Sequence, residues 1–241
     1  MASRPLGTPV TAPPAQLPTD ITLNGRTVEI VRLKASHADD LYSHVTDPSL
    51  WDYMPQDVPK SLPDFRAMFT QLAASADPFL FAIIDKRPPS AGYEATTYEK
   101  PVGYFSLLRM TPEHLSVEIG HVLFSPVLQK TICATEALYL LLRYAFDTLG
   151  YRRVEWKCNS FNEGSRRAAL RYGFTYEGTF RQHMVVKGRN RDTAWFSMLR
   201  EEWDGGIKAA MEGWLDPGNF DDNGRQRSKL EDIRNGLQLK N

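Results

Sequence analysis

The clearest pattern of apolar positions lies between Leu138 and Gly150, where apolar residues recur at intervals of three and four. That spacing places side chains on one face of an α-helix, and the glycine is suited to end it. A second helix is predicted over Asn162 to Tyr172, because asparagine is a favourable N-cap and Gly173 a favourable C-cap. Both helices follow segments that have the alternation of strands.

Short apolar runs bounded by turn residues predict the strands. Because a run of three strands precedes the central helix, a single α/β domain with a mixed sheet fits better than a doubly wound parallel sheet. The predicted strands span residues 27–33, 79–84, 102–108, 116–124, 153–158, 174–177 and 191–199. The other predicted elements are helices over 38–45 and 65–74, the second with Asp64 as N-cap, and a loop over 86–100.

The two ends of the chain differ from this block. Residues 1–20 hold five of the 16 prolines and almost no large apolar side chain, so we predict a disordered arm. Residues 204–241 are polar, with scattered aromatic residues, and predict a partly ordered appendage. The folded domain is therefore expected over residues 21–203.

Composition excludes several classes of protein. The 29 Lys and Arg residues balance 29 Asp and Glu residues, so a nucleic-acid binder, usually basic overall, is not expected. Apolar runs are too short for a membrane span, and two cysteines cannot build a disulfide framework. We expect a cytoplasmic protein with no membrane partner. The five histidines lack ligand spacing, so no metal site is predicted.

The segment from Val117 to Ala137 carries the first chemical signal. A strand ends at a proline, and a short polar loop then opens the central helix. Free backbone amides and the helix dipole at such a junction can bind an anion, with charge added by Lys130 and hydroxyl groups by Thr131 and Thr135. An ordinary strand-to-helix connection has the same pattern, so phosphate binding needs further support.

A family resemblance provides that support. The pyrophosphate loop of the GNAT superfamily of N-acetyltransferases has the pattern Gln/Arg-x-x-Gly-x-Gly/Ala, and this chain has Gln129, Ile132 and Ala134 there. Ile132 replaces the usual first glycine. Over residues 22–203 the chain most resembles the branch that includes the ribosomal-protein N-terminal acetyltransferases. The other matching pieces are Thr135-Glu136-Ala137, Asn162-x-x-Ser165, Gly173-Phe174, Glu177-Gly178 and Arg191-Asp192-Thr193.

The resemblance implies a mostly antiparallel mixed sheet flanked by helices, whose middle strands splay apart to admit acetyl-CoA as acyl donor. The amides of Val122 and Leu123 would contact the pantetheine arm and the thioester oxygen. Asn162 would contact the arm from the other side, besides capping its helix. The full set of coenzyme-binding residues implied is Val122, Leu123, Gln129, Lys130, Thr131, Ile132, Cys133, Ala134, Thr135, Asn162 and Ser165.

The transfer needs a base, because an alkylammonium group with a pKa near 10 has no lone pair at neutral pH. The resemblance implies Glu118, which could instead be a solvent-facing carboxylate of its strand; His121 is a second candidate. Relatives often place a tyrosine, as general acid, four residues before the glycine of the Gly-Phe pair. This chain has Ala169 there, so the acid is unassigned.

The resemblance implies that the acceptor is a primary amine, either a small molecule or a protein N-terminus. Trp51, Asp52 and Tyr53 are the candidate acceptor-binding residues, unless the aromatic residues belong to the core. Six aspartates between Asp39 and Asp64, and an excess of bases from Arg143 to Arg191, predict an acidic acceptor side and a basic coenzyme side. The alternative function is an acyl-CoA-binding module with little activity. The oligomeric state cannot be inferred.

Overall fold

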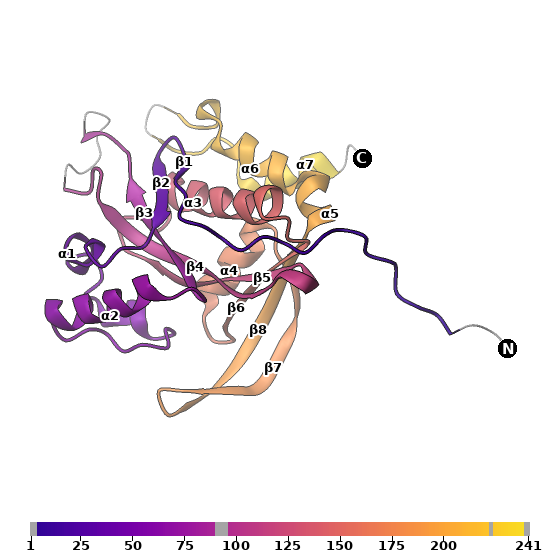
Figure 1. The fold of residues 1–241 in the computed structure, drawn as a ribbon. Helices are drawn as coiled ribbons and strands as arrows, with labels where there is room; N and C mark the ends of the chain where they lie inside the picture. Colours follow the sequence, from indigo (N-terminus) through magenta and orange to yellow (C-terminus); the bar gives the residue numbers. More distant parts are fainter. Residues whose placement is uncertain (1–3, 90–95, 222–223, 239–241) are drawn as a thin grey trace.

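An eight-stranded sheet forms the centre of the computed structural model, which describes residues 4–89, 96–221 and 224–238. The strand order is β1-β2-β3-β4-β5-β6-β8-β7, and every neighbouring pair is antiparallel except β5 and β6 (Figure 1). The predicted mixed, mostly antiparallel sheet is confirmed. The strands are β1 (Leu23–Asn24), β2 (Val28–Arg32), β3 (Phe79–Asp85), β4 (Pro101–Thr111), β5 (Ser116–Phe124), β6 (Arg153–Asn159), β7 (Thr175–Val186) and β8 (Arg189–Leu199).

Helices cover the sheet on both faces, but unequally. Helices α3, α4, α6 and α7 gather on one side, and α1 and α2 lie on the other, beside β3 and β4 (Figure 1). Two buried clusters correspond to these layers, the larger with α3 and the smaller with α1 and α2. The helices are α1 (His37–Tyr42), α2 (Leu62–Ala74), α3 (Ile132–Arg143), α4 (Glu163–Tyr172), α5 (Arg200–Glu202), α6 (Lys208–Leu215) and α7 (Leu230–Gln238).

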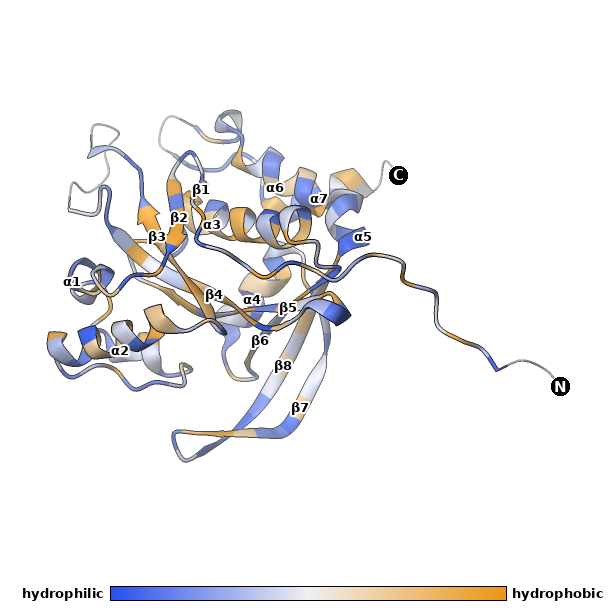
Figure 2. Ribbon diagram, viewed as in Figure 1, coloured by the Kyte–Doolittle hydropathy of each residue, from blue (hydrophilic) through white to orange (hydrophobic). Residues whose placement is uncertain are grey.

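The central helix α3 is buried nearly all round. Its residues from Cys133 to Leu142 are all buried, because the sheet covers one side and α6 packs on another. Hydrophobic residues accordingly concentrate in β2, β3 and α3 (Figure 2). After Arg143 the helix continues as a π-helical turn over Tyr144–Thr148, and Gly150 follows with φ +82°. That left-handed backbone agrees with the predicted termination by glycine.

The middle of the sheet opens at β5 and β6. These strands pair in parallel from Ser116 opposite Arg153 to Ile119 opposite Trp156, and no further pairing between them is found in the described residues. His121 has φ +49°, and the register between β4 and β5 shifts beside it, which marks a β-bulge. A bulge bends the strand, so β5 turns away from β6 beyond Ile119.

The structure corrects several predicted boundaries. Helix α2 begins after Ser61, whose hydroxyl accepts the amide of Asp64; Asp64 therefore lies in the first turn and is not the N-cap. Strand β7 continues to Val186, and with β8 it forms a long hairpin that projects from the body (Figure 1). Its mixed, largely exposed side chains lack the apolar alternation by which a strand is predicted.

Both ends of the chain contact the domain. Residues 4–20 contain no helix or strand, yet the amides of Ala15 and Gln16 donate to the carbonyls of Pro112 and Leu149. Beyond residue 203, Met211 and Trp214 join the same buried cluster as α3. The division into arm, domain and appendage stays a prediction, but the last segment contributes to the core.

Candidate active site

Glu118 lies at the point where β5 and β6 separate. Glu118 is 5% exposed and lies one position before Ile119, the last residue of β5 that pairs with β6. Arg109 of β4 reaches its Oε2 atom at 2.6 Å, and Lys157 of β6 reaches the same oxygen at 3.0 Å. No group among the described residues donates a hydrogen bond to Oε1. The carboxylate is therefore held by one oxygen, and the other oxygen remains available.

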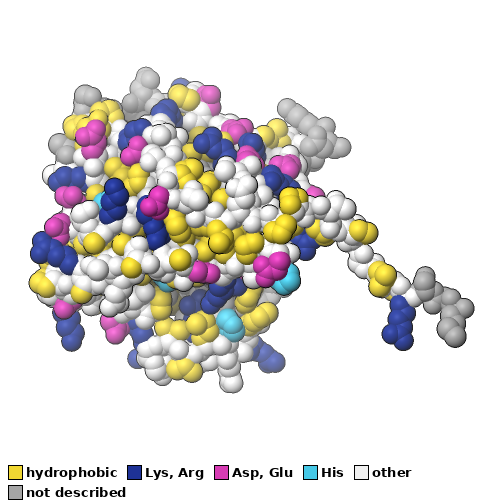
Figure 3. Space-filling view, viewed as in Figure 1, with side chains coloured by type: hydrophobic (Ala, Val, Ile, Leu, Met, Phe, Trp, Pro, Cys, Tyr) yellow, Lys and Arg dark blue, Asp and Glu magenta, His cyan; other side chains and the backbone are white. Residues whose placement is uncertain are grey.

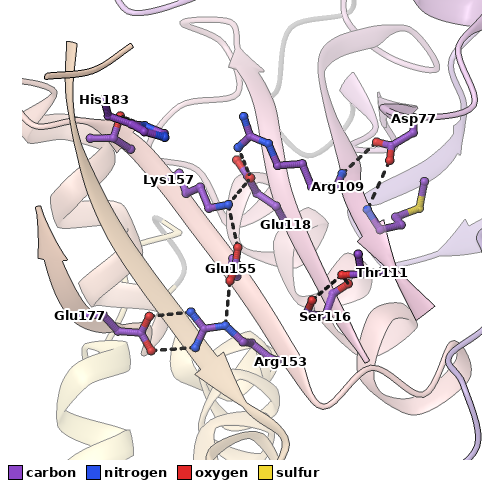
Figure 4. Close-up of polar contacts among 12 residues, drawn as sticks. Asp77, Arg109, Thr111, Ser116, Glu118, Arg153, Glu155, Lys157, Glu177 and His183 are labelled. Atoms are coloured by element: carbon purple, nitrogen blue, oxygen red, sulfur yellow. Dashed lines mark hydrogen bonds and ion pairs between the residues drawn. The ribbon is translucent and has the colours of Figure 1, made fainter. Parts of the chain in front are cut away.

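Glu118 is part of a row of alternating charges across four strands (Figure 4). We call this row the charge ladder. Lys157 joins Glu118 to Glu155, its Nζ atom lying 2.8 Å from Glu155 Oε2 and 3.6 Å from the centre of the Trp195 ring. The ladder comprises Arg109, Glu118, Lys157, Glu155, Arg153 and Glu177. Its three cations balance its three carboxylates, so each buried charge has a partner.

Two carboxylates of the charge ladder, Glu155 and Glu177, have lowered pKa values. Burial alone would raise the pKa of Glu155, but hydrogen bonds from Lys157 and Arg153 outweigh it and lower the pKa. Two hydrogen bonds from Arg153, at 2.7 and 2.6 Å, lower the pKa of Glu177 to about 2, against the smaller opposing effect of burial. Both carboxylates are therefore ionised at neutral pH.

His121, the second candidate base, lies in the bulge of β5. Its Nδ1 atom is 3.2 Å from the hydroxyl oxygen of Ser106. Burial lowers the pKa of His121, partly opposed by the charge of Glu118. The ring is therefore mostly neutral at pH 7 and could accept a proton, so the geometry leaves it as an alternative to Glu118.

The loop before α3 presents free backbone amides, as the anion-site prediction requires. Thr131 caps the helix: its hydroxyl accepts the amide of Ala134 at 3.3 Å and donates to the carbonyl of Leu128. The amides of Ile132 and Cys133 donate no hydrogen bond within the described chain. The left-handed residue of the loop is the exposed Lys130, with φ +60°, so Ile132 does not need the backbone freedom of glycine.

Three other predicted coenzyme residues turn away from this loop surface. The Thr135 side chain is buried, and its hydroxyl accepts a hydrogen bond from Arg171. Cys133 is also buried with its thiol toward the Thr27 carbonyl, and burial raises its pKa to about 11, so it can offer only its amide. The amide group of Gln129 donates to the carbonyl of Phe124 and holds the loop on the end of β5.

The residues predicted for the pantetheine arm border the opening. Val122 and Leu123 lie on β5 beyond its last contact with β6, and because successive amides of a strand point to opposite edges, one of the two faces the opening. Asn162 caps α4 by accepting the amide of Ser165 at 3.0 Å. The Ser165 hydroxyl accepts the indole N–H of Trp156.

The predicted acceptor residues do not form one wall. Trp51 is 1% exposed, and its indole donates to the carbonyl of Val45 inside the smaller core, so its side chain cannot line a pocket. Asp52 is exposed, and Tyr53 is 39% exposed with its hydroxyl on the carbonyl of Phe161. At the tip of the β7–β8 hairpin, Lys187 donates to the Trp51 carbonyl and ties the hairpin to this loop.

The predicted acidic acceptor side is partly neutralised by ion pairs. Three of the six aspartates in the 39–64 window have cationic partners, at 2.6 to 3.4 Å: Asp39 with Arg66, Asp40 with Lys100 and Asp57 with Lys187. Basic and acidic side chains are interspersed over the face seen in Figure 3. Half of the aspartates in the predicted acidic acceptor side are therefore neutralised by contacts that the sequence windows did not show.

The sequence reading missed the partners of Glu118. A signal was present in β6, whose sequence Arg-Val-Glu-Trp-Lys-Cys alternates strictly, so that Arg153, Glu155 and Lys157 share one face. Arg109 had no comparable signal, because it lies where the pairing of β4 with β5 is irregular. No cluster that could hold a metal ion is found among the described residues.

No helix in the described parts of the chain is long and apolar enough to cross a bilayer. A surface hollow of about 660 Å³ lies between α4, β7 and α7 and is lined by none of the predicted site residues. The site around Glu118 is an opening between strands and is separate from this hollow.

Comparison with known proteins identifies the family. A family model described as an acetyltransferase (GNAT) domain matches residues 27–175. A GCN5-related N-acetyltransferase from Brucella melitensis is 39% identical, with a TM-score of 0.87 over 93% of this chain and 99% of that chain. "Putative ribosomal N-acetyltransferase YdaF" of Bacillus subtilis is 34% identical over 103 residues, 43% of this chain and 56% of that protein.

A more distant structure shares the fold alone. The Microcin C7 self-immunity acetyltransferase MccE, solved in complex with acetyl-CoA and AMP, is 18% identical with a TM-score of 0.61, over 73% of this chain and 93% of that chain. Together with the splayed strands and the loop before α3, the closer matches confirm the resemblance seen in the sequence. The chain belongs to the GNAT family of acetyl-CoA-dependent N-acetyltransferases.

Proposed function

We propose that this protein transfers an acetyl group from acetyl-CoA to a primary amine by direct attack in a ternary complex. The observation that carries the proposal is the position of Glu118, a buried carboxylate at the point where β5 and β6 separate. Acetyl-CoA would supply the activated acetyl thioester. The protein would bind the donor, orient the amine and take up its proton.

The residues around the opening fit the donor. The unpaired amides of Ile132 and Cys133, at the N-terminus of α3, suit a pyrophosphate, and the exposed Lys130 adds a positive charge. Asn162 and an amide of the Val122–Leu123 pair suit the amide-rich pantetheine arm. We infer no role for the side chains of Thr135 and Cys133, because both are buried in the core.

Glu118 is the proposed general base. Its Oε2 atom is fixed by Arg109 and Lys157, which leaves Oε1 to accept the ammonium proton directly or through water. The backbone amide of Val122 or Leu123 that faces the opening would donate a hydrogen bond to the oxyanion that develops on the thioester carbonyl. The acid that protonates the CoA thiolate stays unassigned, because Ala169 replaces the usual tyrosine and Tyr172 packs against Trp156.

The test of this assignment is Glu118→Gln, assayed by release of free CoA against a library of primary amines. We expect kcat to fall by about 10²- to 10⁴-fold, with the calorimetric affinity for acetyl-CoA unchanged. The loss should shrink at alkaline pH, because more of the amine is then already deprotonated. Glu177→Gln, which removes a more distant carboxylate of the same ladder, is the matched control and should stay within a few-fold of the wild type.

The alternative is an acyl-CoA-binding module with little activity. The missing tyrosine at Ala169 and the isoleucine at position 132 favour it. Slow hydrolysis of acetyl-CoA with no amine accepted would support the module. Full acetyl transfer by Glu118→Gln would instead remove Glu118 as the base, and failure to bind acetyl-CoA would exclude both functions.

The nature of the amine is a separate question. A protein N-terminus needs an open groove, whereas a small molecule needs a closed pocket. The contact of Lys187 with the Trp51 carbonyl bridges the β7–β8 hairpin and the Trp51–Tyr53 loop, and so favours an enclosed site. We therefore propose a small-molecule amine in preference to a protein N-terminus.

A further inference from the structure

We propose that the acceptor amine also carries an anionic group, a carboxylate or a phosphate, and that Arg191 binds it. This inference rests on the proposed acetyltransferase function and names its substrate class. On the open face of β5, β6 and β8, the partly buried cation Arg191 has no carboxylate partner among the described residues.

Arg191 is partly buried and does not belong to the charge ladder. The charge ladder is balanced by itself, three cations against three carboxylates. Among the described residues, no carboxylate lies within ion-pair distance of Arg191. Burial lowers the pKa of its guanidinium, and the interactions with Cys158 and Glu118 only partly oppose this effect. The protein therefore keeps a partly desolvated cation in the site without compensating it, a cost that a bound anion would remove.

The free end of Arg191 is the end that recognises anions. Its Nε atom donates to the hydroxyl of Thr193 at 3.2 Å, and this hydroxyl also lies 3.0 Å from Nδ1 of His183. No acceptor for the two terminal nitrogens is found in the described chain. These nitrogens form the fork that pairs with a carboxylate or phosphate through two parallel hydrogen bonds. The contact with Thr193 fixes the direction of the fork in advance.

A second unpaired donor lies on the same face. The indole N–H of Trp195, beneath the ammonium of Lys157, is buried and has no partner. Buried donors are normally satisfied. Two donors of this face, the Arg191 fork and the Trp195 indole, thus have no acceptor among the described residues. A purely cationic amine, such as a polyamine, would add positive charge beside a cation that already has no carboxylate partner.

The anion belongs to the acceptor and not to the coenzyme. Arg191 lies close enough to Glu118 and Arg109 for their charges to shift its pKa. Arg191, Thr193 and Trp195 alternate along β8, and Trp195 pairs with Lys157, so Arg191 lies on the face of the charge ladder. The predicted pyrophosphate loop opens α3, which packs on the opposite face with Val154 and Phe196. An anion on Arg191 would therefore lie on the face of Glu118 and not on the face of the coenzyme loop.

The experiment compares matched acceptors that differ only in the anion. Amino acids are supplied as free acids and as their amides, and aminoalkyl phosphates as phosphates and as the parent amino alcohols, with CoA release as the readout. The wild type should acetylate at least one anionic member with a kcat/KM about 10- to 100-fold above its neutral partner. Arg191→Gln should remove this preference without changing the KM for acetyl-CoA.

Two further variants make the result specific. Arg191→Lys keeps the charge but removes the two-nitrogen fork, so it should lose part of the preference for the anionic acceptor. This variant still tests the proposal if Arg191→Gln does not fold. Arg181→Gln removes an exposed positive charge from the same hairpin and should behave as the wild type.

The outcomes separate the two proposals. Acetylation of amines with no preference for the anionic partner, or a raised KM for acetyl-CoA in Arg191→Gln, would overturn the inference and leave the acetyltransferase function intact. Equal acetylation of peptide N-termini with and without acidic side chains would overturn it too. Binding of acetyl-CoA with no acetylation of any amine would overturn the proposed function itself.

Discussion

The two faces of strands β5, β6 and β8 are built in opposite ways. One face carries Val117, Val154 and Phe196, which are at most 1% exposed and pack in the large core with α3 and α4. The other carries the charge ladder, with Glu118 and Lys157 almost as deeply buried. Burial of an apolar face stabilises the folded protein directly. Burial of charges stabilises it only if the interactions between the charges exceed the cost of desolvating them. The first face therefore holds the sheet together, and the second positions charge.

The largest expected effect separates the two faces at neighbouring residues. Phe196→Ala opens a cavity in the apolar face and should lower the free energy of unfolding by about 3–5 kcal/mol. Ser197→Ala, next in sequence but on the polar face, removes only the hydrogen bond to Glu177 and should cost about 1 kcal/mol. Urea unfolding of both variants measures the contrast. Equal losses would show that the two faces contribute alike.

A somewhat smaller effect is expected for the centre of the charge ladder. Lys157→Met removes the cation shared by Glu118 and Glu155 and should destabilise the protein by about 3 kcal/mol, because two buried carboxylates lose a partner while Arg109 and Arg153 remain. Urea unfolding measures this loss. In the double variant with Glu118→Gln, the combined loss should be smaller than the sum of the single losses.

Additive losses would contradict the ladder as an energetic unit. So would a Lys157→Met variant as stable as the wild type, which would mean that water reaches the carboxylates. In either case the polar face would resemble an ordinary solvated surface, and the contrast with the apolar face would weaken.

Local patterns explain what the sequence could predict. The capped helix α4 and the strand β5 were predicted within a residue, because caps and alternation lie in neighbouring positions. The N-cap of α2 was misplaced by three residues, since Ser61 and Asp64 both have side chains suited to capping. The coenzyme loop depended on a resemblance, because a helix N-terminus alone is not specific.

The rest of the site is set by strand order. Glu118 meets Lys157 and Glu155 only because β5 and β6 are parallel neighbours with Glu118 opposite Glu155, and local periodicity does not contain that register. Trp51 shows the reverse problem: its neighbours in sequence suggested a pocket, whereas its indole lies against Val45 in the core. Side-chain burial depends on the packing of α1 and α2 over β4.

The smallest expected effect lies at the outer end of the charge ladder, where Glu177 is 40% exposed. Its pKa falls from an ordinary 4.5 to about 2 because Arg153 hydrogen-bonds both carboxylate oxygens. A carboxylate with a depressed folded-state pKa stabilises the fold above its unfolded pKa, and this contribution is lost as pH falls toward the folded value. Since solvent screens the pair, Glu177→Gln should cost only about 0.5–1 kcal/mol at pH 7. The difference from wild type, followed by urea unfolding, should narrow between about pH 4.5 and pH 2, and a difference independent of pH would show that Arg153 does not hold this carboxylate ionised.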